Sequence, residues 1–454
     1  MNQTPRLHDD WLDPDAVEIV RLLQNKGFTA YLVGGCVRDL LLNHNPKDYD
    51  IVTNARPQEI RRIIPFCFII GKRFRLVLAK RGDRQYEIST FRQDAAPPEP
   101  PSENTVEGGT TEGYTESDSE GGSSGGAETS EPAPNPSAPA AEMITSDNIF
   151  GTPEEDAFRR DFTINAMFYD PISKKLIDYA NAKKDLHDGL VRMIGDPNIR
   201  LIEDPIRILR AIRLSQMIRF TLETELRRAM KAHASYLAKT ALPRRREEFL
   251  KFLRLKDPAE PFVLAHDLDV LKFVSPSLDR ILSDHDKAEV FLKHLHDMKL
   301  KDKASPLELF GAIAHAFLRT EIQPDPHVEM RTHDLLDNKK FVSWMRDEMG
   351  IFKSEQAMIA RAMNLSSLLR RRKEFERRGD SRKRAVINNA AFDIALQMAK
   401  SDLTLSPSDL QFWHETYERL KVAAPVGHSG GGGSRVHRRP RRQNHRRSRG
   451  PASH

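Results

Sequence analysis

The hydrophobic positions of the first 93 residues predict short helices and strands in alternation. Asp13 is expected to cap the first helix, Pro14 to begin it and Gly27 to end it. The apolar residues behind this start signal share one helix face: Ala16, Ile19, Val20 and Leu23. Strands are expected at residues 28–33, 48–52, 66–70, 75–80 and 85–91. The pattern therefore predicts a small domain that mixes helices with a sheet, closed by a hairpin turn at Gly82-Asp83.

The second half of the chain has the pattern of an all-helical protein. Apolar residues return at helical spacing from about residue 203 to residue 422. The expected breaks fall at prolines: Pro243, Pro261, Pro276, Pro306 and Pro324 to Pro326. The predicted fold class is therefore α+β, with a head built on a mixed or antiparallel sheet and an all-α body behind it.

Two segments interrupt these patterns. Residues 94–147 are rich in Pro, Gly, Ser, Thr and Glu, and they contain twelve acids with no Lys or Arg. Too few apolar residues are present to offset the entropy of ordering, so a disordered insertion on a surface turn is expected. Residues 426–454 contain eight Arg and no acid, behind the flexible run Gly430 to Gly433. This tail is expected to be disordered too.

Composition narrows the class of protein. Of the 454 residues, 39% are hydrophobic and 30% charged, and no run approaches the length of a membrane-spanning helix. The only cysteines, Cys36 and Cys67, indicate a reducing compartment, for which the cytoplasm is the expectation. The net charge of +6 indicates a polyanionic partner, although many soluble proteins carry a similar charge.

The candidate chemistry begins at Asp48-Tyr49-Asp50, on a predicted strand. Because strand side chains alternate, Asp48 and Asp50 should share one face while Tyr49 and Ile51 point into the core. Two adjacent carboxylates repel unless a cation neutralises them, and hard oxygen ligands favour Mg²⁺. An isolated Asp-x-Asp is more often a solvated or capping pair. A third carboxylate, Glu87, lies on the hairpin strand and would complete a two-metal site for nucleotidyl transfer.

Upstream, Gly34-Gly35 stands between a predicted strand and a predicted helix. Such a turn exposes backbone N–H groups to a phosphate, and Arg38 follows within reach of the same anion. The alternative is a plain glycine turn.

Together these residues resemble the class II branch of the polymerase β superfamily, which holds bacterial poly(A) polymerases and CCA-adding enzymes. The resemblance runs through Gly34-Gly35, Arg38-Asp39, Asp48-Tyr49-Asp50 and the Glu87 strand. Residues 159–166 are similar to the family's second motif, associated with ribose recognition, and residues 203–213 resemble its base-recognition helix. The resemblance implies a polymerase β-like head, Mg²⁺ as cofactor, and attack of an RNA 3′-hydroxyl on a nucleotide α-phosphate with release of pyrophosphate.

The resemblance also implies roles for individual residues. Asp48, Asp50 and Glu87 would be catalytic, with the metal on the first two. The nucleotide and its phosphates would contact Gly34, Gly35, Arg38, Arg160, Asp161, Asp204, Arg207, Arg210 and Arg213. An acid and a guanidinium can read a base edge, since one accepts from an exocyclic amine and the other donates to ring acceptors. Asp204 is also expected to cap a helix that Pro205 begins. For Arg210 and Arg213, the role of a solvated surface residue fits the sequence equally well.

Three segments favour poly(A) over CCA synthesis. Residues 69–76 are similar to the basic stretch of bacterial poly(A) polymerases, residues 147–151 resemble that branch, and the Arg-rich tail suits varied RNA 3′ ends. The expected RNA-binding residues are Lys72, Arg73, Arg75, Arg438, Arg439, Arg441 and Arg442. The expected activity is AMP transfer from ATP to RNA 3′ ends, in RNA polyadenylation. A CCA-adding or A-adding tRNA enzyme is the alternative, and a non-catalytic RNA-binding protein is the remote one.

The resemblance divides the chain into six segments. RNA 3′ ends and ATP are the expected partners, with RNA degradation machinery as an open candidate and no membrane. The segments are residues 1–93 and 148–200 for the two parts of the head, 94–147 for the insert, 201–270 for a nucleotide- and RNA-binding neck, 271–425 for the helical body and 426–454 for the tail.

Overall fold

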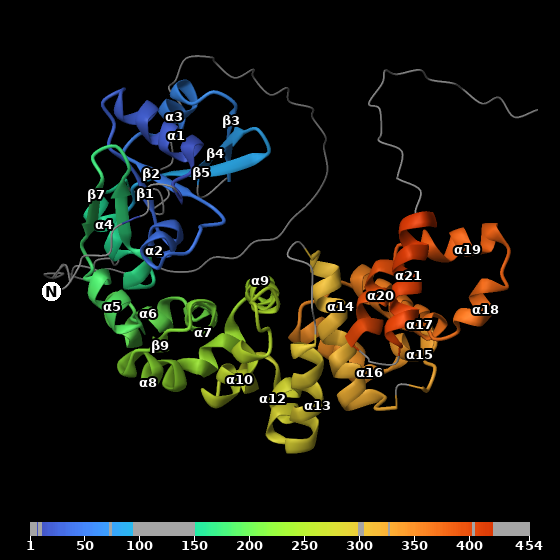
Figure 1. The fold of residues 1–454 in the computed structure, drawn as a ribbon. Coiled ribbons are helices and arrows are strands. Elements are labelled where there is room, and N and C mark those ends of the chain that lie inside the picture. The colour runs from blue at the N-terminus through green and yellow to red at the C-terminus, as the bar shows by residue number, and fades with distance from the viewer. Residues whose placement is uncertain are drawn as a thin grey trace, which may run out of the picture.

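A computed structural model describes most of the chain (Figure 1). The described residues are 7, 11–71, 75–93, 150–297, 304–325, 327–401 and 405–420. The predicted acidic insert and the predicted Arg-rich tail both lie outside these ranges. Figure 1 shows the sheet-containing head at one end of the molecule and the last helices at the other, with a run of helices between them.

A seven-stranded mixed sheet forms the centre of the head. Its strand order is β3-β4-β5-β2-β1-β6-β7, and β2 and β5 are the parallel pair. The bounds are β1 (Ala30–Val33), β2 (Asp50–Thr53), β3 (Cys67–Ile70), β4 (Leu76–Arg81), β5 (Arg84–Thr90), β6 (Met167–Asp170) and β7 (Lys175–Asp178). All five strands predicted before the insert are present, and the hairpin turns where Gly82-Asp83 was expected, because Arg81 pairs with Arg84. The predicted α+β class is confirmed.

The first helix follows its sequence signals closely. α1 spans Pro14–Gln24, and the Asp13 carboxylate accepts hydrogen bonds from the backbone N–H groups of Asp15 and Ala16 at 2.9 and 3.1 Å. The same carboxylate accepts a hydrogen bond from the Tyr86 hydroxyl at 2.8 Å and pairs with Arg84. Asp13 therefore caps the helix, as expected, and also ties it to β5.

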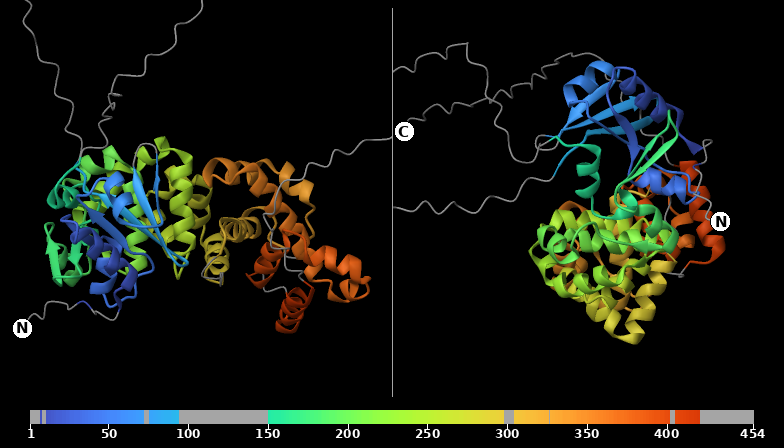
Figure 2. Two further views of the ribbon diagram at one scale, coloured as in Figure 1. Left: turned by 90° about the horizontal axis from the view of Figure 1, so that it is seen from above. Right: turned by 90° about the vertical axis from the view of Figure 1, so that its left-hand side faces the viewer.

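The two faces of the sheet are buried by different partners. One face packs beneath α1, α2 (Gly35–Leu41) and α3 (Pro57–Ile63), in a cluster that includes Leu32, Ile51 and Ile88. The other face carries a smaller cluster around Val33, Val52 and Phe168, covered by α4 (Pro153–Phe158) and its neighbours. Figure 2 shows how the head stacks on the following helices when the molecule is viewed end-on. The second face is the one that carries Asp50.

Short elements connect the head to a long helical region. The connecting elements are α5 (Ala182–Asp188), β8 (Leu190–Val191), α6 (Pro197–Glu203), α7 (Ile206–Ile218), β9 (Thr221–Leu222) and α8 (Thr224–His233). The helices that follow are α9 (Leu242–Leu253), α10 (Glu260–Asp267), α11 (Leu271–Val274), α12 (Pro276–Ser283), α13 (His285–His296), α14 (Pro306–Phe317), α15 (Thr332–Asp337), α16 (Lys339–Ser343), α17 (Lys353–Leu369), α18 (Arg372–Glu376), α19 (Asp380–Ile387), α20 (Phe392–Ser401) and α21 (Pro407–Leu420). Apart from the two-residue strand β9, the described part of residues 203–422 is built of helices, close to the expected all-helical pattern.

One buried cluster runs through this helical region without a break. It extends from Phe162 in the head to Tyr417 in α21, so the neck and the body share a hydrophobic core. Their division near residue 270 stays a prediction. Among the helices of the described ranges, none is both long and apolar enough to cross a membrane.

Candidate active site

Asp50 is the first residue of β2, and Asp48 lies just before that strand. The prediction that Asp48 belongs to the strand is therefore wrong by two residues, because pairing with β1 begins at Asp50. The predicted alternation nevertheless holds. Tyr49 and Ile51 are buried in the core, while Asp48 and Asp50 are exposed.

Glu87 is the direct neighbour of Asp50 across the sheet. The parallel register of β2 and β5 pairs Asp50 with Glu87, so the two side chains emerge side by side on one face. Partial burial at the sheet raises the pKa of Asp50 to about 6, and repulsion by Glu87 and by Asp48 adds to this rise, while the Arg160 charge opposes it. The pair therefore concentrates negative charge that a cation would neutralise.

The predicted trio is not assembled into a finished metal site. Within the described ranges, no three histidine, cysteine, aspartate or glutamate side chains form a cluster that would hold a metal ion. Asp50 has the chemistry for a hard divalent cation, because it offers a solvent-accessible carboxylate whose ionised form is disfavoured until such a cation arrives. A metal role for Asp48 and Asp50 stays a prediction, as does the catalytic role of Glu87.

Gly34 makes the turn that brings the phosphate-binding candidates together. Its backbone has φ +80°, a left-handed conformation that favours glycine. A Cβ atom placed on Gly34 would lie 3.4 Å from Nη1 of Arg160, 3.8 Å from the Asn165 carbonyl oxygen and 4.0 Å from Oδ2 of Asp50. The glycine turn, the second predicted motif and the first carboxylate therefore converge at one place.

Arg38 is buried beneath this turn. Its guanidinium donates from Nε and Nη2 to Oδ1 of Asp39, at 2.9 and 2.6 Å, and from Nη1 to Oδ1 of Asn165 at 2.6 Å. Only 4% of the residue is exposed. Arg38 thus joins α2 to the Asn165 turn, and its predicted contact with phosphate would require some of these donors to change partners.

Asp156 orients the arginines of the second motif, a role that was not predicted from the sequence. This fully buried carboxylate accepts from Arg159 Nε and Arg160 Nη2, each at 2.8 Å, and from the backbone N–H of Arg92 at 3.2 Å. Burial tends to raise the pKa of Asp156, but the charges of Arg160 and Arg159 outweigh burial and hold that pKa below its ordinary range. Its only sequence signal is an acid in the first turn of a helix, which is common.

Asp161 links the head to the predicted base-recognition helix. Its carboxylate pairs with Arg207 Nε at 3.0 Å and with Arg210 Nε at 2.8 Å. Arg207 also donates from Nη1 to the Arg200 carbonyl oxygen at 2.6 Å and to Glu203 Oε2 at 3.1 Å. The structure therefore brings Asp161, Arg207 and Arg210 together, and their contact with a nucleotide stays a prediction.

Asp204 lies in the joint between α6 and α7. Its carboxylate accepts a hydrogen bond from the Ile206 backbone N–H at 3.3 Å, but the expected cap is displaced, because the N-cap residue of α7 is Pro205. The expectation that Pro205 begins that helix is off by one residue, because α7 starts at Ile206. The other carboxylate oxygen accepts from Arg244 Nη2 at 2.8 Å. Arg244, on α9, is a further candidate that the sequence reading did not select.

Arg213 reaches a buried acid on α9. Its Nε donates to Glu248 Oε2 at 2.9 Å, and Lys251 Nζ donates to Glu248 Oε1 at 2.8 Å. Burial tends to raise the pKa of Glu248, yet Arg213 and Lys251 together hold it below its usual range.

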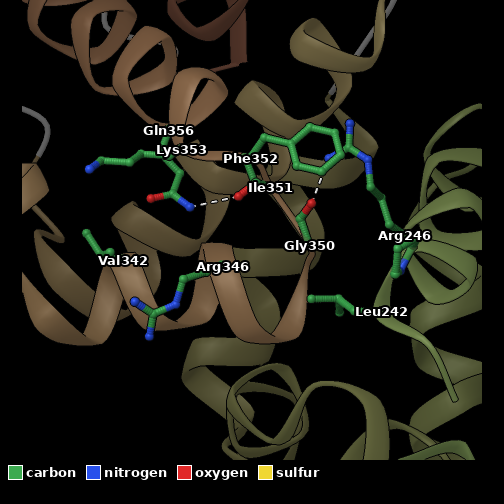
Figure 3. Close-up of a pocket in the computed structure, with 10 residues that line it drawn as sticks. Leu242, Arg246, Val342, Arg346, Gly350, Ile351, Phe352, Lys353 and Gln356 are labelled. Atoms are coloured by element: carbon green, nitrogen blue, oxygen red, sulfur yellow. Dashed lines mark hydrogen bonds between the residues drawn. The ribbon is translucent and has the colours of Figure 1, made fainter. Parts of the chain in front are cut away.

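A cavity of about 430 Å³ lies behind α9, where that helix meets α17 and the π-helical turn Trp344–Glu348 (Figure 3). Arg246 forms one wall, pairing with both carboxylate oxygens of Glu355 at 2.9 Å and donating to the Gly350 carbonyl oxygen at 2.9 Å. Its guanidinium lies 4.4 Å from the Phe352 ring centroid. None of the predicted site residues lines this cavity, so it is separate from the candidate site.

Most of the predicted RNA-binding residues lie outside the part of the chain that the structure describes. Lys72, Arg73 and the four tail arginines lie outside the described residues. Arg75 lies within the described residues, directly before β4, and it is exposed.

The histidines of α13 contact different partners, because His294 bonds to the Val290 carbonyl oxygen and His296 pairs with Asp257.

Comparison with known proteins agrees with this geometry. Residues 30–192 match the family described as the poly A polymerase head domain, and residues 219–282 match the probable RNA and SrmB-binding site of polymerase A. The chain belongs to the poly(A) polymerase and tRNA nucleotidyltransferase family. The first match contains the Gly34 turn, Asp50 and Glu87.

Curated relatives carry two different names. Poly(A) polymerase I of Haemophilus influenzae is 32% identical over 319 residues, which are 68% of this chain and 63% of the relative. The E. coli protein of the same name is 33% identical over 60% of this chain and 52% of its own length. A CCA-adding enzyme of Lactobacillus helveticus is 31% identical over 52% of this chain and 49% of the relative. The chain therefore spans about half to two thirds of the length of these relatives.

Solved structures agree on the fold. The CCA-adding enzyme of Bacillus stearothermophilus, in complex with CTP, superposes with a TM-score of 0.59 at 19% identity, over 90% of this chain and 82% of that one. The CCA-adding enzyme of Thermotoga maritima superposes with a TM-score of 0.51 at 20% identity, over 92% and 86%. At such identities the likeness shows the arrangement of head and helices, not the activity.

Proposed function

We propose that this protein is a template-independent nucleotidyltransferase that extends RNA 3′ ends. The observation that carries the proposal is the pairing of Asp50 with Glu87 on an open sheet face, beside the Gly34 turn. Nucleotidyl transfer needs concentrated negative charge for divalent metal beside a phosphate-binding turn, and this face of the head offers both. These residues fall within the stretch that matches the poly A polymerase head domain, which supports the proposal.

In this proposal the chain's own residues bind and orient the reactants. Asp48 and Asp50 would hold Mg²⁺, and the bound ion would supply positive charge to acidify the 3′-hydroxyl and to neutralise the pyrophosphate. Gly34, Gly35 and Arg160 contact the triphosphate, and Glu87 supports the metal site from the neighbouring strand. Their convergence around Gly34 supports this assignment.

Base recognition is assigned to the joint between the head and α7. Asp204 would accept a hydrogen bond from an exocyclic amine, while Arg207 would donate to a ring acceptor. Arg244 and Asp161 hold these two side chains in place through the ion pairs at 2.8 and 3.0 Å. Arg210 joins this network through Asp161, whereas Arg213 forms a separate pair with Glu248 on α9.

The finer proposal is that ATP is the donor and that AMP is added repeatedly, as in RNA polyadenylation. It rests on the basic stretch at residues 69–76 and on relatives named poly(A) polymerase I, which align over more of this chain than the relative named CCA-adding enzyme. The second candidate is CCA addition to tRNA, favoured by that 31% identical relative.

One set of incubations tests both levels. The protein receives Mg²⁺ with ATP alone or with ATP and CTP, and either an unstructured RNA or a tRNA that lacks its CCA end. Long ladders of added A on both RNAs are expected. Extension that stops after CCA on the tRNA would replace poly(A) with CCA synthesis. Absence of any extension would refute nucleotidyl transfer itself.

A further inference from the structure

An apolar row lies on the same sheet face as the candidate carboxylates. The strand registers pair Phe68 with Leu78, Leu78 with Glu87, and Glu87 with Asp50. Residues paired across neighbouring strands project to the same face, so all four side chains form one continuous row. The side chains on the other face of these strands pack into the buried core beneath α1 and α3; they are Ile69, Val77, Ile88 and Ile51. The assignment of the faces is therefore consistent over four strands.

This row is covered at one end and open at the other. Val33 and Phe168 continue it across β1 and β6, where the second cluster buries them. At the β3 edge, in contrast, Phe68 is 58% exposed and the next residue of the same parity, Ile70, is 42% exposed. An aromatic ring and a branched aliphatic side chain thus stand in solvent two strands away from Glu87.

Positive side chains gather where this open face ends. Arg75 precedes β4 and is exposed, and the Arg92 guanidinium donates to the Arg75 carbonyl oxygen at 3.2 Å. A third guanidinium, that of Arg159, lies in the same region, because Asp156 Oδ1 accepts both from Arg159 Nε at 2.8 Å and from the Arg92 backbone N–H at 3.2 Å. Burial and the Arg159 charge lower the pKa of Arg92. Asp156 is the carboxylate that faces this group, and it pairs with Arg159 at 2.8 Å.

We propose that the open face, defined by Phe68, Ile70 and Leu78, is the platform on which the last bases of the RNA 3′ end stack. Single-stranded RNA is bound by aromatic and apolar surfaces for its bases and by cations for its phosphates, and both lie here beside the carboxylates. The platform reads no base edge, since none of its side chains has a hydrogen-bonding group. It therefore accepts RNA 3′ ends of varied sequence. This inference rests on the proposed function, because the RNA is taken to be its substrate.

The test measures stacking without catalysis. A short oligoadenylate with 2-aminopurine as its 3′-terminal base is titrated with the full-length protein, since stacking quenches the fluorescence of this base. Wild-type protein should quench the probe, and Phe68→Ala should raise the dissociation constant about tenfold, the loss expected for one stacking contact. Phe68→Trp should restore binding, because it keeps an aromatic face, whereas Phe68→Leu should not.

The matched control is Ile172→Ala, set against Ile70→Ala. Both isoleucines are 42% exposed, but Ile172 follows β6 near the opposite edge of the sheet. Only Ile70→Ala should weaken binding and raise the KM for RNA, with the KM for ATP unchanged. Equal RNA binding by wild type and Phe68→Ala would overturn the platform, as would a change in self-association with RNA binding intact, which would indicate a protein interface.

The outcomes separate the two proposals. Quenching that depends on Phe68, in a protein that never extends RNA, would keep the platform and refute the proposed reaction. Extension that is indifferent to Phe68 would keep the reaction and refute the platform. A wild-type protein that binds no RNA would refute both.

Discussion

The candidate sites of the head and of the neck differ in whether their acidic side chains are paired with basic ones. On the head, Asp50 and Glu87 stand side by side, and their repulsion contributes to a pKa of about 6 for Asp50. In the neck and at its junction with the head, acids and bases are matched, as in the pairs of Asp161 with Arg207, Asp204 with Arg244, and Glu248 with Arg213. The head therefore holds an unneutralised charge, whereas the neck holds a network of satisfied ion pairs.

This difference indicates two kinds of binding. A cation that binds in the head relieves the repulsion between the Asp50 and Glu87 carboxylates, and this relief favours its binding. A nucleotide that enters the neck meets groups whose positions are already fixed by partners, and it must exchange or share those hydrogen bonds. Fixed partners reduce the entropy lost on binding, and they suit selection between similar bases.

The largest effect is expected from neutralising the head. Asp50→Asn should reduce RNA extension by at least about a thousandfold, because it removes the charge proposed to hold the divalent ion. Gel analysis of extension under single-turnover conditions measures this rate. RNA binding, followed by anisotropy, should stay within about twofold.

The matched control for this variant is Asp83→Asn, which neutralises an exposed acid in the nearby hairpin turn. It should extend RNA at the wild-type rate. An active Asp50→Asn enzyme would remove the distinction between head and neck, because the head charge would then have no catalytic role.

An intermediate effect is expected in the neck. Arg207→Ala should lower kcat/KM for ATP by about 10- to 100-fold, because one bidentate base contact is worth about 1–3 kcal/mol. It should also narrow the preference for ATP over CTP. Steady-state kinetics with each nucleotide measures both changes.

Arg228→Ala provides the comparison for Arg207, since Arg228 forms an exposed ion pair with Glu225 on α8. Such pairs contribute little, so its kinetics should match wild type. If Arg207→Ala retained full discrimination, base selection would have to be assigned outside the neck.

The smallest effect concerns pH and stability. A carboxyl whose folded pKa is raised to about 6 binds its proton more tightly in the folded than in the unfolded state. Its contribution to stability therefore falls as pH rises from about 4 to about 6. Without divalent metal, Asp50→Asn should unfold at a higher temperature than wild type at pH 7.5, by about 2 °C because the group is partly solvated, and by less at pH 4.5.

Thermal unfolding with a chelator and with Mg²⁺ checks this expectation. Added Mg²⁺ should stabilise wild type and leave Asp50→Asn unchanged, which would close the gap. A gap equally large at pH 4.5 would mean that the ionisation of Asp50 is not its cause.

Local patterns in the sequence predicted much of the head. The Asp13 cap, the helix that follows it, the five strands before the insert and the turn at Gly82 all depend on neighbouring residues, and all are observed. The boundary at Asp48 was missed because strand pairing, rather than propensity, decides where β2 begins. The second motif was recognised, but its buried anchor Asp156 was not, because an acid in a first helical turn has many ordinary explanations.

The sequence by itself determined which residue types are available: paired acids on a strand, a glycine turn and arginines at helical spacing. Period-two alternation was enough to place Asp48 and Asp50 on the face opposite Tyr49. Only the tertiary structure decided which of these groups meet. The parallel pairing of β2 with β5 sets Glu87 beside Asp50, and the path of α9 sets Arg244 on Asp204 and Glu248 on Arg213. Contacts between residues distant in sequence depend on strand order and helix packing, which no local pattern encodes.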